Sequence, residues 1–312
     1  MNGTLNLTDD YYVQCESCLG WELTVCNSLY PEFSPCRKVL KRPDSYGNLL
    51  YGHLSKAIPM DRLEQIIEIG GGYGYLMADF IARNPRLKPT MLDISPYLSG
   101  RQRETLSGRD VRYIVEDFMK IEPRLLEGRD MAILNENLGD FPTALRVPVQ
   151  LLKTPPRRSG GLLEQIRRLF DAYGFGDPDV EKFSFNIGAV EAVEKLCLSG
   201  IPYVFLSEHS CEAVAPEEYK DLIRIQSTGY PERISLKGHC EYTVKFSYLE
   251  KVAGAFHYQT IRGSLADFLT PRFDERLRHV LALRSVNDDL IEIIRHFIED
   301  LFKYEYLILI KR

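Results

Sequence analysis

The chain has 312 residues, of which 45% are hydrophobic and 27% are charged. These proportions are typical of a folded globular protein and exclude a disordered, collagenous or coiled-coil chain. The length suits one large α/β domain with insertions, or two modest domains. The net charge of −5 provides no overall positive field, so nucleic acid is excluded as an expected partner.

The first 45 residues differ from the rest because they show few periodic patterns and are rich in cysteine. We predict a separate segment or cap at 1–45, followed by the main domain at 46–312. Its four cysteines, which are enough to bind zinc or an iron–sulfur cluster, are Cys15, Cys18, Cys26 and Cys36. Structural zinc sites usually contain two close pairs, and only Cys15 and Cys18 form one here. Free thiols packed in a cap are the alternative, and we assign no metal ligand.

The amino terminus also bears on location. The stretch "MNGTLNLTDDYYVQC" has no basic start followed by an apolar core, so it does not indicate a signal peptide. No apolar run reaches the roughly 18 residues of a membrane span. The odd count of seven cysteines fits a reducing compartment. We therefore predict a cytoplasmic protein with no membrane partner.

From residue 60 onward, short apolar runs alternate with helical patterns, which is typical of βαβ units. The predicted fold is α/β, a Rossmann-like, seven-stranded, mainly parallel sheet with helices on both faces. Strands are expected near 64–69, 89–93, 111–115, 131–135, 201–206, 255–261 and 304–310. Over 60 residues separate the fourth and fifth strands. The breaks "KTPPRRSGG" and "GFGDPD" in this interval predict an inserted lobe at about 143–187.

A glycine run lies between the first strand and the first helix of this pattern, in "IIEIGGGYGYLMADF" at 66–80. A strand, a glycine turn and a helix place free N–H groups and a positive helix end at one edge of a sheet, where nucleotide-like ligands bind. The dinucleotide fingerprint fails, because Tyr75 or Met77 takes the position of its last small residue. A P-loop fails as well, because no Lys followed by Ser or Thr closes the run.

Acidic residues follow the next two strands. Asp93 ends the second strand, 23 residues after Gly70, where a carboxylate can accept both hydroxyls of a ribose. Asp117 and Phe118 follow the third strand in "YIVEDF". Each acid alone is more often a helix cap than a ligand. Their order behind the glycine run favours a nucleoside site.

The acidic-x-G-x-G-x-G pattern of the glycine run resembles that of the class I S-adenosylmethionine-dependent methyltransferases. The resemblance implies that the glycines approach the methionine and ribose parts of the cofactor, that an acid lies near its amino group, and that the final strand is antiparallel. A carboxylate also suits a cofactor that carries an ammonium and a sulfonium. The implied cofactor-binding residues are Glu68, Gly70, Gly72, Gly74, Asp93, Ile94, Asp117 and Phe118.

A narrower resemblance begins after the fourth strand. The stretch "ILNENLGDFPT" is similar to the N-E-F-F-D-A-L-P box of the MidA-type methyltransferases, which include the mitochondrial complex I assembly arginine methyltransferase. Gly139 takes the position of the acid in the box, and Asp140 follows it. After the fifth strand, "SEHS" stands at the position where the family has a D-Y-G. The positions that match are Asn135, Glu136, Pro142, His239, Glu241, Tyr242, Phe268 and Leu269, in a resemblance that covers 46–312.

This resemblance implies transfer of a methyl group from S-adenosyl-L-methionine to a protein side-chain nitrogen, arginine-like. Glu136 is the first predicted catalytic residue, because a carboxylate could bind a guanidinium through two hydrogen bonds and take its proton. Asn135 is the second predicted catalytic residue. The alternative role of Glu136 is capping, and that of Asn135 is local hydrogen bonding to the backbone. His239, Glu208 and His209 are further candidates with structural alternatives. A small-molecule methyl acceptor, or a cofactor-binding assembly factor with little turnover, are the alternative functions. Homo-oligomerisation is left open.

Overall fold

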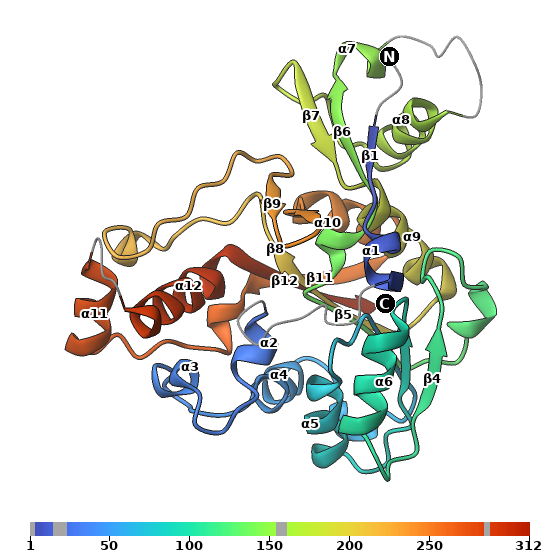
Figure 1. Cartoon of the computed structure of the whole chain (residues 1–312). Coiled ribbons are helices and arrows are strands. Elements are labelled where there is room, and N and C mark those ends of the chain that lie inside the picture. Colours follow the sequence, from blue (N-terminus) through green and yellow to red (C-terminus); the bar gives the residue numbers. More distant parts are fainter. Residues whose placement is uncertain (1–3, 15–23, 154–160, 284–287) are drawn as a thin grey trace.

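The computed structural model describes residues 4–14, 24–153, 161–283 and 288–312. Its centre is a seven-stranded sheet with the strand order β11-β12-β8-β5-β2-β3-β4 (Figure 1). All seven predicted strands are confirmed. They are β2 (Ile66–Ile69), β3 (Thr90–Asp93), β4 (Arg112–Val115), β5 (Met131–Asn135), β8 (Tyr203–His209), β11 (Tyr258–Ser264) and β12 (Tyr304–Lys311).

The sheet is mainly parallel. Strands β4, β3, β2, β5 and β8 pair in parallel, whereas β12 runs antiparallel between β8 and β11. The antiparallel strand at the carboxyl end is therefore confirmed. The register places Ile69 beside both Leu92 and Leu134. The carboxyl ends of β2, β3 and β5 therefore meet at one edge, outside which open α/β sheets bind ligands.

Both faces of the sheet are covered, as predicted. Strands β2 and β5 are buried on both sides, which is why they read as continuous apolar runs. Ile66 and Ile133 belong to a core with helices α4, α5, α11 and α12, and Ile67 and Leu134 to a second core with α8, α9 and α10. The helices of the domain are α4 (Tyr46–Leu54), α5 (Tyr75–Arg83), α6 (Pro96–Thr105), α9 (Ile187–Ser199), α10 (Phe246–Ala255), α11 (Glu275–Ala282) and α12 (Asp289–Lys303).

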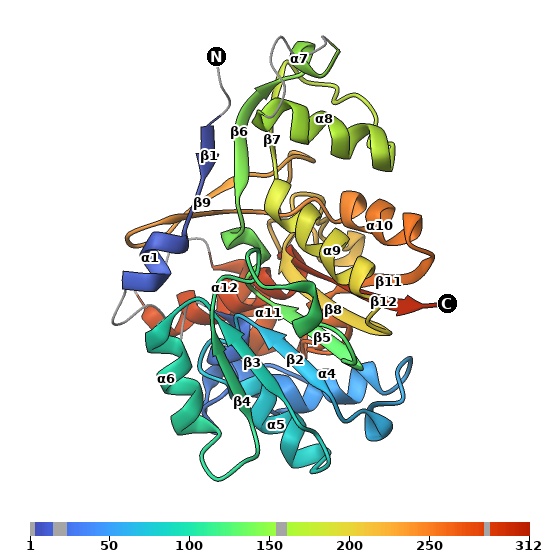
Figure 2. The ribbon, with the colours of Figure 1, turned by 90° about the vertical axis from the view of Figure 1, so that its right-hand side faces the viewer.

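The predicted inserted lobe lies between β5 and β8. It contains β6 (Thr143–Pro148), α7 (Gln150–Lys153), α8 (Leu162–Tyr173) and β7 (Lys182–Phe185). Figure 2 shows it standing above the central sheet. Its small sheet has the order β1-β6-β7, because strand β1 (Thr4–Asn6) pairs antiparallel with β6. No strand was predicted at the amino terminus, because the three residues of β1 are too few to show a period.

The rest of the amino-terminal segment forms α1 (Asp9–Gln14), α2 (Val25–Ser28) and α3 (Pro35–Lys38). Leu29 and Leu40 are buried in the same core as Ile66. Cys26 and Cys36 are free thiols, and Cys15 and Cys18 lie outside the described residues. The boundary at residue 45 and the state of the four cysteines stay predictions. Within the described ranges, no helix is long and apolar enough to cross a membrane.

A short hairpin lies beside the loop that follows β5. It consists of β9 (Arg233–Ser235) and β10 (Cys240–Tyr242), which pair antiparallel. A parallel bridge between Ser210 and Val244 joins the segment after β10 to the end of β8. The hairpin thereby brings residues near 240 beside the loop after β5, where the one-turn 3-10 helix η3 (Leu138–Asp140) lies.

Candidate cofactor and active site

A cavity of about 330 Å³ lies at the carboxyl edge of β2, β3 and β5. This volume is at the lower end of the range for small-molecule sites, about 300–1,000 Å³. Nine of the ten site residues predicted from the sequence line the cavity. They are Glu68, Gly70, Gly72, Asp93, Ile94, Asp117, Phe118, Asn135 and Glu136. Gly74 is the exception, because it is the N-cap of α5 and packs behind the turn against Gln102.

The glycine turn is bare because other side chains already fill the space beside it. Gly70 has φ 64°, a left-handed conformation that L-residues rarely adopt, and a Cβ there would lie 2.4 Å from Nδ2 of Asn137. A Cβ on Gly71 would lie 2.5 Å from Cε of Met91 and 2.9 Å from Cδ of Glu68. The turn therefore presents its backbone to the cavity, with Glu68 packed directly beneath it.

Two buried carboxylates form the floor of the cavity. Glu68 and Asp93 are each 2% exposed. Burial, and then the charge of Asp93, raises the pKa of Glu68 to about 8. Burial raises the pKa of Asp93 to about 6, although the Ser95 N–H and Nε2 of Gln102 donate hydrogen bonds to it at 2.9 and 2.8 Å. Oε2 of Glu68 is buried and has no hydrogen-bond partner among the described residues. An unpaired buried acid of this kind favours a cationic ligand.

Asp117 and Phe118, the predicted cofactor-binding residues after the third strand, lie on the wall of the same cavity. Phe118 is buried and stacks at 6.1 Å on Phe141, another lining residue. Asp117 accepts the Met119 N–H at 2.8 Å and forms an ion pair with Lys120 at 3.0 Å. Its carboxylate is therefore engaged in the turn that follows β4, not in a helix cap, while still lining the cavity.

The predicted catalytic pair lies where β5 ends. Glu136 has φ 55°, and its two carboxylate oxygens accept the N–H groups of Val25 at 2.7 Å and Cys26 at 2.9 Å. Burial raises its pKa to about 7, although those two hydrogen bonds oppose the shift. Asn135 donates to Glu136 at 3.2 Å and accepts from the Tyr46 hydroxyl at 2.5 Å. Glu136 thus caps α2 from inside the cavity, and its catalytic role stays a prediction.

The further candidates lie close to one another behind η3. Glu208 is buried and accepts the N–H groups of Gly139 at 3.0 Å and of His209 at 2.7 Å. His209 lies 3.4 Å from Asp300. His239 contacts Asp140, which lines the cavity, at 3.6 Å. Glu208 and His209 therefore have structural partners, whereas His239 belongs to a polar cluster at the edge of the cavity.

Sequence reasoning missed one wall of the cavity, which the amino-terminal segment supplies. Thr8, Tyr12, Cys26 and Asn27 line it from α1, α2 and the segments before them. Nothing in their local sequence relates them to a site 60 residues later. Asn137 was also missed, although it follows Glu136 directly. Its position within the quoted "NEN" was the available signal, and its Nδ2 donates to the Ile69 carbonyl at 2.6 Å.

Sequence comparison finds no known family that matches the chain and no curated protein that is similar to it. Solved structures are similar at low identity. An uncharacterized protein from Burkholderia thailandensis matches with a TM-score of 0.55 and 15% identity, over 94% of this chain and 87% of that one. A member of the same superfamily from the same organism, bound to S-adenosyl-homocysteine, matches with a TM-score of 0.50 and 15% identity, over 90% of this chain and 78% of that one. The chain thus has the Rossmann-like fold of methyltransferases.

Proposed function

We propose that the protein is an S-adenosyl-L-methionine-dependent methyltransferase. The observation that carries the proposal is the pair of buried acids, Glu68 and Asp93, beneath a glycine turn that a side chain would block. A cation with a sugar suits these groups, because Glu68 gains a partner for its free oxygen and Asp93 can accept from hydroxyls. A pyrophosphate would be repelled by both. The structural relative bound to S-adenosyl-homocysteine supports the same ligand class.

The residues present fit the cofactor. The orphaned oxygen of Glu68 would take its ammonium, Asp93 beside Ile94 its ribose, and Phe118 one face of its adenine. When bound, S-adenosyl-L-methionine supplies an electrophilic methyl group on a sulfonium. The chain's own task is then to hold an acceptor in line behind that methyl and to exclude water.

We further propose that the acceptor is a protein side-chain nitrogen, arginine-like. The charge of the lining supports a cationic acceptor, since the cavity carries seven acidic residues and one basic residue: Asp9, Glu68, Asp93, Glu116, Asp117, Glu136, Asp140 and Lys120. Four of the acids, Asp9, Glu116, Glu136 and Asp140, lie outside the predicted cofactor residues. A guanidinium could enter beside them with two-pronged hydrogen bonds. In this proposal Glu136 releases α2 to bind the acceptor and remove its proton, and Asn135 orients the acceptor nitrogen.

Two measurements test this proposal. Calorimetry should show one S-adenosyl-homocysteine bound per chain, and Asp93→Ala should weaken that binding at least about tenfold through the lost sugar contact. Radiolabelled cofactor in a cell extract should then transfer label to protein. Label in small molecules alone would favour a metabolite as acceptor. No binding of the cofactor or of its product at millimolar concentration would overturn the proposal.

A second candidate function is a cofactor-binding assembly factor with little turnover. One observation favours it: both carboxylate oxygens of Glu136 are occupied by the N–H groups that begin α2. A carboxylate held in this way has fewer free lone pairs for an acceptor and is fixed in place by the helix that it caps. Tight binding of S-adenosyl-homocysteine, without transfer of label to any molecule of the extract, would support this function over the first.

A further inference from the structure

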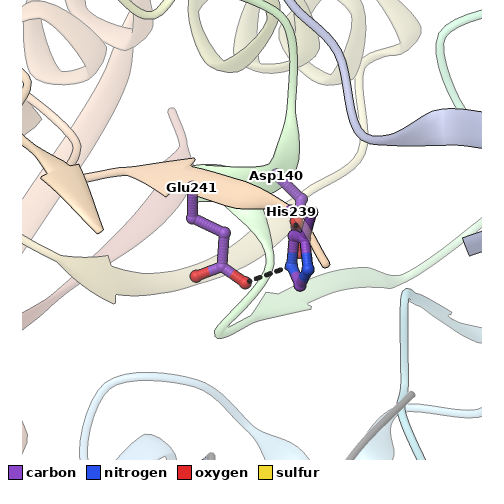
Figure 3. A group of neighbouring side chains, drawn as sticks. All are labelled: Asp140, His239 and Glu241. Carbon is purple, nitrogen blue, oxygen red and sulfur yellow. Dashed lines mark hydrogen bonds and ion pairs between the residues drawn. The ribbon is translucent and has the colours of Figure 1, made fainter. Parts of the chain in front are cut away.

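A polar cluster lies at the edge of the cavity, between η3 and the start of β10. Figure 3 shows its three members, Asp140, His239 and Glu241, with their polar atoms directed toward one another. Nε2 of His239 lies 3.2 Å from Oε1 of Glu241 and 3.6 Å from Oδ1 of Asp140. One nitrogen and one carboxylate oxygen from each acid lie within 4.8 Å of one another.

The cluster is not satisfied by its own hydrogen bonds. Nε2 of His239 carries at most one hydrogen, so it cannot donate to both carboxylates. The Tyr12 hydroxyl donates to Oδ2 of Asp140 at 2.9 Å, but Oδ1 of Asp140 is buried and finds no hydrogen-bond partner in the described part of the chain. Two acids thus share one imidazole, and the cluster has excess negative charge.

His239 is held in position for a ligand. Its side chain is 8% exposed, and the Tyr11 ring stacks on it at 4.1 Å with an interplanar angle of 23°. Two ligand atoms at about 2.1 Å from one metal ion lie about 3.0–3.4 Å apart at angles between octahedral and tetrahedral. The observed separations of 3.2 and 3.6 Å from Nε2 of His239 to the two carboxylates are close to that range, and the three ligand atoms all lie within 4.8 Å of one another.

We propose that Asp140, His239 and Glu241 form a binding site for a divalent first-row transition-metal ion. One imidazole nitrogen and two carboxylate oxygens make a donor set that suits ions such as Mn²⁺ or Zn²⁺. An organic cation satisfies the set less well, because the nitrogen lone pair of a neutral imidazole adds a bond only to a metal or a donor hydrogen. Three protein ligands leave coordination positions open, as in catalytic sites.

The proposed metal site lies at the edge of the cavity. Asp140 and Tyr12 both line the cavity, so an ion bound to Asp140 lies at its edge. The ion would also connect the loop after β5 with the β9–β10 hairpin. The affinity is expected to be modest, because Nδ1 of His239, which must carry the proton when Nε2 binds a metal, has no described acceptor. Such outer partners are worth about 10–100-fold in affinity.

Manganese is the probe of choice, because Mn²⁺ binds weakly to thiolates and so avoids the four cysteines near the amino terminus. Untagged full-length protein, treated with a chelator, is titrated with Mn²⁺ without methyl donor, and free Mn²⁺ is followed by electron paramagnetic resonance. One ion should bind per chain, and spin-echo modulation should show one bound imidazole nitrogen. No binding at about 1 mM Mn²⁺, near the weak end of specific affinities, would overturn the proposal.

Variants assign the binding to this cluster. His239→Gln and Glu241→Gln should each weaken Mn²⁺ binding at least about tenfold. Asp300→Asn is the matched control, because Asp300 also lies beside an imidazole, 3.4 Å from His209, but outside the cluster. Binding by both cluster variants at the wild-type affinity would overturn the proposal. If His239→Gln unfolds without metal, Glu241→Gln decides, since Glu241 is 18% exposed and lies in a short hairpin. Cofactor binding is measured separately, so the two proposals fail independently.

Discussion

At the residue scale, the floor of the cavity depends on a carboxylate that is protonated in the free protein at neutral pH. Burial raises the pKa of Glu68 to about 8, while its value in the unfolded chain is about 4.3. Its protonated form is therefore the favoured one in the folded state at pH 7, and the stability of the fold falls as the pH rises from about 4.3 through 8, where the folded protein keeps a proton that the unfolded chain has lost. A cationic ligand reverses the preference, because it stabilises the ionised form.

This reversal predicts proton release on binding. At pH 7 the wild-type protein should release nearly one proton per S-adenosyl-L-methionine bound, as Glu68 ionises against the ligand's ammonium. Calorimetry in buffers of different ionisation enthalpy measures the number. Glu68→Gln should bind more weakly and release almost none. Equal proton release by both proteins would show that Glu68 does not meet the cation.

Glu136 offers a second prediction at this scale. Glu136→Gln keeps the shape of the side chain but replaces one accepting oxygen with a donor, so α2 loses a hydrogen bond from Val25 or Cys26. We expect a loss of about 1–2 kcal/mol in the free energy of unfolding. We also expect faster amide exchange at 24–28. Unchanged exchange beside lost methyl transfer would assign Glu136 to catalysis, and unchanged transfer would remove it from the mechanism.

The sequence predicted which residues lie together at the carboxyl edge of β2 and β3, and missed another wall of the cavity, for a physical reason. Glu68, Gly70 and Asp93 belong to strands and turns whose local pattern determines where they lie, because parallel strands end at a common edge. Tyr12 and Asn27 reach the cavity only through tertiary packing. No period or motif in a short helix records a contact with residues more than 40 positions away.

At the element scale, β12 shows how a terminal strand is attached to the fold. Its apolar run predicted the strand from the sequence, and its antiparallel place followed from family resemblance. The register beside β8 and β11 brings Glu305 to Arg262, which also contacts Glu212 and Glu250 at 3.0 Å each. One arginine therefore holds three acids from separate elements.

Removing this arginine should be costly. Arg262→Met leaves three partly buried carboxylates without their shared cation, and we expect a loss of about 3 kcal/mol at pH 7 in urea unfolding. Burial alone would raise the pKa of Glu212, but hydrogen bonds from Ser247 and the charge of Arg262 outweigh it and lower that pKa, so the stabilising effect of Glu212 is lost as the pH falls below the unfolded-chain value of about 4.3 and through the lowered pKa. The loss in the free energy of unfolding caused by Arg262→Met should therefore be smaller at pH 4 than at pH 7. Lys220→Met, at an exposed ion pair with Glu217, should change stability little.

At the scale of the whole molecule, the amino-terminal segment joins the inserted lobe to the cavity. Strand β1 pairs with β6 of the lobe, and the residues that follow it cross the cavity edge. Thr8 is buried and its hydroxyl donates to the Asp140 carbonyl at 2.7 Å. The segment thus forms a wall of the cavity, where the sequence suggested a separate segment or cap, with a cap over the cofactor as one possibility. The inserted lobe was predicted from its breaks, but the strands β1, β6 and β7 of its small sheet were not.

Deleting residues 1–14 tests this arrangement. The sheet and both cores would keep their strands and helices, so far-UV circular dichroism should stay close to that of the full chain. The cavity would lose the wall that contains Thr8 and Tyr12, and water would reach Glu68 and Asp93. Because water weakens the attraction between these acids and a cation, S-adenosyl-homocysteine should bind at least about tenfold more weakly, or about 1.4 kcal/mol. Thr8→Val removes one hydrogen bond and keeps the wall, so its affinity for S-adenosyl-homocysteine should lie between those of the full chain and the truncated chain. An unchanged affinity in the truncated chain would show that the segment lies beside the cavity without closing it.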